Sequence, residues 1–336
     1  MNDNVVVLDT PLQKPDVAKM LAVITAYNEF WEKRTFEFLP LLHESIERHR
    51  KGFYQSIEDL SKNSEALAVA IKNEDVEGLL NKFLEVVDDP EEKEFYLEEI
   101  QGSAKKIGEK LDVLLAEVTS ATKSIASLPV YDAERDRLSL VEALKDVVST
   151  LQLLNDALTT KRNEVEELDK AIEVFELNGI ESQFEGQLPS VEQIQGLVTQ
   201  GATTAGAAVA IEQALEVVNK VLGGIEQGMH YSRLQEQRRS LKNQVQDMVD
   251  EQHEQQQKDS KLNSQIKSLE AYVPLTELRT QWLAEKNKIL TQMQGERNKL
   301  QSLKSVDVAL AKQLIKLFKG VFDYVMHIVS MYRKAL

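Results

Sequence analysis

The chain lacks cysteine and has few prolines, few aromatic residues and no cluster of basic residues. Its 336 residues include no Cys and 7 Pro, 6% are aromatic and 28% are charged. The absence of Cys excludes disulfides, thiol catalysis and thiolate metal sites. A formal net charge of −15 without a basic face argues against sequence-independent binding to nucleic acid. Because the chain also has no long linker rich in Gly, Ser or Pro, its composition is typical of long helices, and the predicted fold class is all-α.

Sequence motifs for catalysis and metal binding are missing as well. The five histidines form no metal-ligand pattern such as two His four residues apart on a helix; they are His43, His49, His230, His253 and His327. Gly201 and Gly206 have the spacing of a phosphate-binding loop. Ala207 and Ala208, however, occupy the positions where such a loop has its Lys and its Ser or Thr. We therefore expect no enzymatic activity, no metal and no cofactor.

The N-terminal segment does not have the pattern of a secretory signal. Residues 1–15 contain acidic side chains and only a four-residue apolar patch, Val5 to Leu8. We expect the protein to be made in the cytoplasm without a signal peptide, and to be released or secreted by another route if it acts outside the cell.

Apolar residues at helical spacing predict an elongated rod of long helices that runs out, turns and comes back. The expected parts are the N-terminal part of a tail helical bundle (1–129), a stalk helix (130–177), a head (178–230), a return stalk helix (231–302) and a C-terminal bundle helix (303–336). One long helix is predicted from Asp16 to Asn73, with a kink at Pro40.

The stalk has a heptad pattern typical of a coiled coil. One seam consists of Leu144, Leu151, Leu158, Val165 and Ile172, and a second of Val147, Leu154, Leu168 and Phe175. The return helix repeats the pattern with Leu234, Leu241, Met248, Leu262 and Leu269. The last helix contains a very apolar stretch, 313–332, but its polar side chains share one narrow face, so a core helix is favoured over a membrane span.

The head segment differs from the rest of the chain in its small and uncharged residues. It holds 8 of the 14 glycines, and residues 193–211 carry no charge. Such a run is about as long as a helix that crosses a ~30 Å hydrocarbon layer, but its Gln and Thr residues make it too polar for a constitutive anchor. Residues 211–225 follow with one polar and one apolar face, as in a helix that lines a pore. Two other interpretations stay open, namely a helix packed on a core and the binding tip of a cytosolic coiled-coil scaffold or tether.

Together, the order of these elements and the Gly/Ala/Thr-rich head resemble the ClyA-type α-pore-forming toxins, and most of all the B component of the XaxAB/YaxAB-type binary cytotoxins. The resemblance implies a soluble protein that swings out its head helices and assembles with an A component into a hetero-oligomeric ring at the membrane of a target host cell.

The resemblance also assigns roles to residues of the head. The membrane-inserting residues would be Leu197, Val198, Val209, Ile211, Leu215, Val218, Val221, Leu222 and Ile225. The residues facing the pore lumen would be Glu212, Glu216 and Lys220, and the hinges would be Gly179, Gly186, Gly223, Gly224 and Gly228.

Two consequences of these roles can be checked. The apolar face must be covered before insertion, so the head should fold back on itself or on the stalk. Charges introduced at Leu215 and Val218 should abolish lysis while leaving the soluble fold intact. Six Glu and one Lys between Asn178 and Gly228 would be repelled by anionic lipid, so a partner would have to recruit the chain to the membrane.

Overall fold

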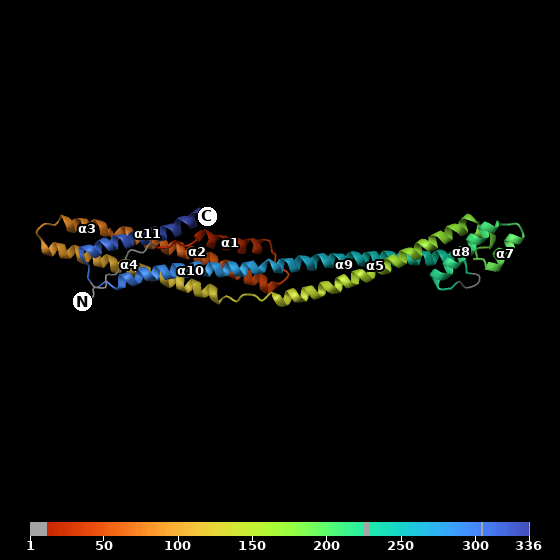
Figure 1. The fold of residues 1–336 in the computed structure, drawn as a ribbon, viewed down its shortest axis with the longest axis horizontal. Coiled ribbons are helices and arrows are strands. Elements are labelled where there is room, and N and C mark those ends of the chain that lie inside the picture. The colour runs from red at the N-terminus through yellow and green to blue at the C-terminus, as the bar shows by residue number, and fades with distance from the viewer. Residues whose placement is uncertain (1–11, 225–228, 304, 336) are drawn as a thin grey trace. The chain divides into compact units, whose positions relative to one another are not determined.

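The structure, a computed structural model, describes residues 12–224, 229–303 and 305–335, and their regular elements are α-helices (Figure 1). The predicted all-α fold class is therefore confirmed. The chain divides into two compact units, one formed by residues 1–135 and 267–336 and the other by residues 136–266.

The helices of the first unit begin at residues that cap or start helices. They are α1 (Val17–Glu32), α2 (Pro40–Glu74), α3 (Val76–Glu85), α4 (Pro90–Ser127), α10 (Tyr272–Gln301) and α11 (Val308–Ala335). The side chain of Asp16 accepts a hydrogen bond from the backbone N–H of Lys19 at 2.9 Å, and that of Asp89 accepts bonds from Glu91 and Glu92 at 3.0 Å. These bonds satisfy donors that a helix N-terminus leaves without partners.

The prediction of one kinked helix from Asp16 to Asn73 is wrong. The chain forms two helices, α1 and α2, and the segment between them includes Arg34 at a φ of 51°. Pro40 is the first residue of α2. Proline has no N–H to donate to the preceding turn, but this does not matter in the first turn of a helix, so Pro40 starts a helix instead of bending one.

Aromatic side chains form the centre of the first unit. The ring of Phe53 on α2 lies 5.0 Å from the rings of both Tyr27 on α1 and Trp282 on α10. The guanidinium of Arg279 donates hydrogen bonds to the carbonyl oxygens of Ile125, Ala126 and Leu128 at 2.9 to 3.2 Å, which caps the C-terminus of α4. Helix α11 packs on α1, α2, α3, α4 and α10 and buries its apolar face, so it is a core helix as predicted.

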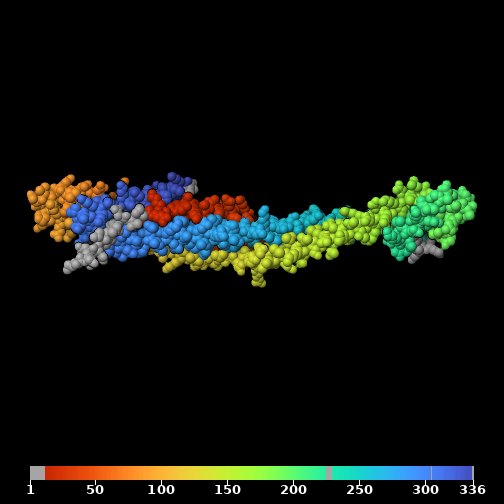
Figure 2. All heavy atoms as spheres, viewed as in Figure 1, coloured from red at the N-terminus to blue at the C-terminus, as the bar shows by residue number. Residues whose placement is uncertain are grey.

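The second unit contains α5 (Glu134–Leu177), α6 (Ile180–Gln183), α7 (Val191–Thr199), α8 (Ala205–Leu222) and most of α9 (Tyr231–Glu270). Side-chain bonds join Asn155 to Gln252 and Asp169 to Lys242 and Arg238, so α5 and α9 run antiparallel. The seam positions Leu158, Leu168, Ile172 and Phe175 are buried, whereas Leu144, Val147, Leu151 and Val165 are half-buried. Figure 2 shows α7 and α8 packed closely around the end of α5.

Candidate membrane-insertion head

Helices α7 and α8 form a hairpin whose ends are set by local hydrogen bonds. Ser190 and Gln193 make a capping box at the start of α7, with bonds of 2.8 and 3.3 Å between each backbone N–H and the other side chain. The hydroxyl of Thr204 caps α8 by accepting from the N–H of Ala207 at 3.3 Å. Gly223 ends α8 with a φ of 73°, a left-handed conformation that favours glycine.

The uncharged run 193–211 is not one helix. It is divided between α7, a turn that contains Gly201 at a φ of 73°, and the start of α8. The two-faced segment was expected over 211–225, whereas α8 begins at Ala205, after the Thr204 cap, and ends at Leu222. No helix among the described residues is long and apolar enough to cross a membrane.

The apolar face of α8 is covered by the second unit itself. Ile211, Leu215 and Val218 are buried in one cluster with Leu168, Ile172 and Phe175 of α5. Leu188, Ile194, Met229, Tyr231 and Leu234 also belong to this cluster. The expectation that the head folds back on itself or on the stalk is confirmed.

The other predicted inserting residues lie in three environments. Val198, Val221 and Leu222 are half-buried and pack against the same cluster, and Leu197 is half-buried. Val209 is 53% exposed. Ile225 lies outside the described residues.

The expectation that charges at Leu215 and Val218 leave the soluble fold intact is wrong. Val218 is fully buried and Leu215 is 6% exposed. A carboxylate at either position would lie in the apolar cluster without a partner. An unpaired buried charge destabilises a fold by on the order of several kcal/mol.

The predicted lumen-facing residues lie on the outer side of α8. Glu216 and Lys220 are exposed, and Glu212 is half-buried. The amine of Lys220 lies 3.1 Å from a carboxylate oxygen of Glu167 on α5. The predicted hinges Gly179, Gly186, Gly223 and Gly224 have φ values of 62°, 75°, 73° and 134°, whereas Gly228 lies outside the described residues.

Polar side chains next to the head join α5 to α9, and the sequence analysis did not single them out. The hydroxyl of Tyr231 donates to Glu176 at 3.0 Å, and burial together with this hydrogen bond raises the pKa of Tyr231 to about 12. Burial raises the pKa of Asp169, but hydrogen bonds from Lys242 and Arg238 outweigh it and leave that pKa below its ordinary value. In the sequence these residues lie beside the apolar seam positions. Charged residues at such positions are also common on solvent-exposed helix surfaces, so the pattern alone does not single them out.

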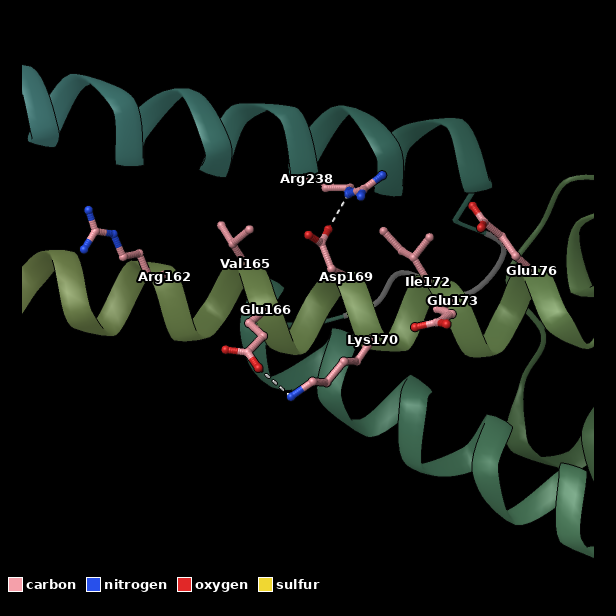
Figure 3. A pocket seen from close by; sticks show the side chains of 9 residues that line it. All are labelled: Arg162, Val165, Glu166, Asp169, Lys170, Ile172, Glu173, Glu176 and Arg238. Atoms are coloured by element: carbon pink, nitrogen blue, oxygen red, sulfur yellow. Dashed lines mark hydrogen bonds and ion pairs between the residues drawn. The ribbon is translucent and has the colours of Figure 1, made fainter.

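A cavity of about 400 Å³ lies beside this junction and is lined mainly by charged side chains of α5 (Figure 3). Asp169 points toward Arg238, and Glu166 pairs with Lys170 at 2.7 Å on the same helix. In the part of the chain that the structure describes, no group of three or more His, Asp or Glu is arranged to hold a metal ion. The cavity is therefore a surface hollow between ion pairs.

No known sequence family matches the chain, and no curated protein matches it in sequence. Solved structures do match over nearly the whole length. XaxB from Xenorhabdus nematophila is 17% identical, with a TM-score of 0.79 over 96% of this chain and 100% of XaxB. The chain has the fold of XaxB. PaxB from Photorhabdus luminescens shares it, at 13% identity and a TM-score of 0.78 over 97% of this chain and 99% of PaxB.

A chain of the XaxAB pore complex from Xenorhabdus nematophila also matches, at 16% identity and a TM-score of 0.50 over 96% of this chain and 99% of that one. The predicted resemblance to the B component of binary α-pore-forming toxins is thus confirmed for the XaxB fold. At these identities the likeness establishes the fold, and the activity has to be argued from the head.

Proposed function

We propose that the chain is a pore-forming cytotoxin subunit that assembles with an A component at a target host cell membrane and inserts its head helices there. One observation carries the proposal. A chain with the XaxB fold has, in its head, an amphipathic helix whose apolar face is covered by residues of its own unit, from α5, α9 and the neighbouring head segments.

The covered face of α8 makes release energetically feasible. Burying Ile211, Leu215 and Val218 contributes about 1.5 to 3 kcal/mol for each side chain, or about 5 to 9 kcal/mol together. Lipid tails are as apolar as this cluster, so the same side chains regain most of that free energy when they enter a bilayer. Release of α8 also uncovers Leu168, Ile172 and Phe175 of α5, so contacts with a partner must cover these side chains for the exchange to balance.

We infer that α8 spans the bilayer as one helix of an assembled ring, in which its polar face lies against the water-filled lumen. Its 18 residues are about 27 Å long at 1.5 Å per residue, close to the ~30 Å hydrocarbon thickness, whereas the 9 residues of α7 reach about half of that. In the inserted helix, Ile211, Leu215, Val218 and their apolar neighbours face lipid or adjacent subunits. Glu212, Glu216 and Lys220 line the aqueous lumen.

Glycines on both sides of the hairpin are suited to act as hinges. Gly179 and Gly186 precede α7, and Gly223 and Gly224 follow α8, all at positive φ. A residue without Cβ can leave this conformation and adopt others at little steric cost. We infer that these four positions absorb the backbone rotation when α8 leaves α5.

The charge of the head favours recruitment by a second protein. Between residues 178 and 224 the sequence has Glu181, Glu185, Glu192, Glu212 and Glu216 but only one basic residue, Lys220. An acidic surface is repelled by anionic lipid, so the A component supplies the first membrane contact.

The test is dye release from liposomes and lysis of red cells by the purified chain, alone and with a candidate A component from a neighbouring gene. Release that needs both proteins supports the binary pore. If no mixture releases dye while the chain stays monodisperse and helical, pore formation is refuted and a coiled-coil scaffold or tether becomes the better explanation.

A further inference from the structure

A polar cavity lies between α2 and α4 in the first unit, outside the head. It has a volume of about 310 Å³, and small or polar residues line most of it, including Gly52, Ser56, Ser120 and Ser124, together with the carboxylates of Asp59 and Glu117. Helices α2 and α4 pack along one another (Figure 1). Ser120 and Ser124 are exposed, so the cavity opens to solvent.

Two groups that line this cavity are buried without a hydrogen-bond partner. Within the described residues, neither carboxylate oxygen of Glu117 has a partner, and the same holds for the hydroxyl of Ser56, a residue that is 3% exposed. Burial raises the pKa of Glu117, and the positive charge of Lys286 opposes this effect. A carboxylate in this position is stabilised by any group that brings hydrogen-bond donors into the cavity.

Lys286 does not provide enough charge to balance the cavity. Its fully buried amine donates to the backbone carbonyl of Ser56 at 3.1 Å and lies 5.2 Å from the ring centroid of Trp282. Asp59 already accepts from the amide of Gln55 at 3.0 Å. With Lys286, Glu117 and Asp59 ionised, one ammonium faces two carboxylates, so one negative charge is left over.

We propose that this cavity binds an alkylguanidinium or alkylammonium group. Such a group has donors and no acceptors, which suits the oxygens of Glu117 and Ser56, and its single positive charge balances the cluster. The volume equals that of roughly ten waters at about 30 Å³ each, enough for a basic side chain. A doubly charged metal ion suits the site less well, because the positive charge of Lys286 already acts on Glu117.

The group has two sources with the same chemistry, an Arg or Lys side chain of another polypeptide or a free amine. Both can be tested on the full chain by following backbone amide NMR signals of α2 and α4. The probes are ethylguanidinium chloride and a short peptide with one arginine between alanines, blocked at both ends, with NaCl at equal ionic strength as the reference. Peptide binding at least tenfold tighter identifies a polypeptide as the source, and equal affinities identify a free amine.

Three variants make the test specific. Glu117→Gln keeps the size and removes the charge, and because it removes a buried unpaired carboxylate, we expect it to fold. Ala121→Leu fills the cavity without a change of charge. Glu109→Gln removes an exposed charge on the same helix, away from the cavity.

The expected result is a saturable shift confined to residues around the cavity. Glu117→Gln should weaken binding at least tenfold, Ala121→Leu should abolish it, and Glu109→Gln should leave it unchanged. The proposal is overturned if neither probe shifts the signals beyond NaCl, or if Glu117→Gln binds as the unaltered chain does, in which case the cavity holds only water. The site uses residues of the first unit alone, so this outcome does not depend on pore formation.

Discussion

Lys220 of α8 and Glu167 of α5 form an ion pair, with the amine nitrogen 3.1 Å from a carboxylate oxygen. The two side chains are 72% and 41% exposed, and exposed pairs of this kind contribute only about 0 to 1 kcal/mol. The pair therefore marks where α8 crosses α5, while the apolar cluster below it holds the head closed. A weak ion pair at this crossing can break when the head opens and form again when it closes.

Cross-linking α8 to α5 at this pair should block pore formation. Because the chain has no Cys, the double variant Glu167→Cys/Lys220→Cys carries its only two thiols at the two positions of this ion pair. A bifunctional thiol reagent with a reducible disulfide spacer can span the distance left by the two long side chains. We expect the cross-linked protein to release no dye with the A component, and release to return after reduction. Full release by the cross-linked protein would contradict insertion of α8.

Val209→Asp tests which face of α8 meets the lumen without disturbing the fold, because Val209 is 53% exposed in the closed head. The substitution should change the free energy of unfolding by no more than about 0.5 kcal/mol. At 100° per residue, Val209 shares a stripe of α8 with Glu216 and Lys220, so in the inserted helix an Asp at this position faces the lumen and lysis should be kept. Urea unfolding and red-cell lysis on the same preparation measure both effects.

The matched control for Val209→Asp is Val148→Asp, at a position on α5 that is 51% exposed and outside the hairpin. It should lyse red cells as the unaltered chain does. Leu215→Asp should instead lose both stability and lysis, because Leu215 is buried. Loss of lysis by the Val209 variant alone would argue that this stripe of α8 faces lipid and not the lumen.

Replacing the two glycines at opposite ends of α8 by alanine should change the stability of the fold in opposite directions. Gly223 has a φ of 73°, where a Cβ costs roughly 1 to 2 kcal/mol. Gly206 lies in the first turn with open space at its Cβ position, so alanine there should stabilise by up to about 1 kcal/mol. Thermal unfolding monitored by circular dichroism checks both signs. Two variants with equal melting temperatures would contradict this account of the Gly223 cap.

The sequence was sufficient to predict the apolar face of α8, because the 3.6-residue period is a local property. It also predicted that other apolar side chains must cover this face, because its exposure to water costs free energy. It could not identify Leu168, Ile172 and Phe175 of α5 as that cover, since no local rule relates residues about 40 positions apart. For the same reason it predicted that charges at Leu215 and Val218 would leave the soluble fold intact.

The polar cavity could not be predicted, for a different reason. Glu117 and Lys286 lie on long amphipathic helices where charged residues are common, and their spacing is that of a solvent-exposed face. Only packing reveals that Lys286 is fully buried and that the oxygens of Glu117 have no donor among the described residues. The interruption between α1 and α2 was missed because Pro40 is compatible with either a kink or a helix start.

The buried amine of Lys286 makes the stability of the first unit depend on pH. Burial lowers its pKa to about 8, against the opposing effect of the Glu117 and Asp59 carboxylates. In the unfolded chain a Lys has a pKa of about 10.4. Between these two values the unfolded chain binds a proton at this position that the folded chain does not, so stability should rise with pH through this window.

We expect the unaltered chain to gain about 2 kcal/mol of stability from pH 7.5 to pH 9.5 relative to Lys286→Met. Both tryptophans, Trp31 and Trp282, belong to the first unit, so tryptophan fluorescence during urea unfolding reports on that unit alone. The range ends at pH 9.5 because unfolded tyrosines ionise near pH 10, whereas burial raises the pKa of Tyr27 and Tyr324 in the folded chain. Parallel stability curves for the two proteins would mean that Lys286 stays charged in the folded state at all these pH values.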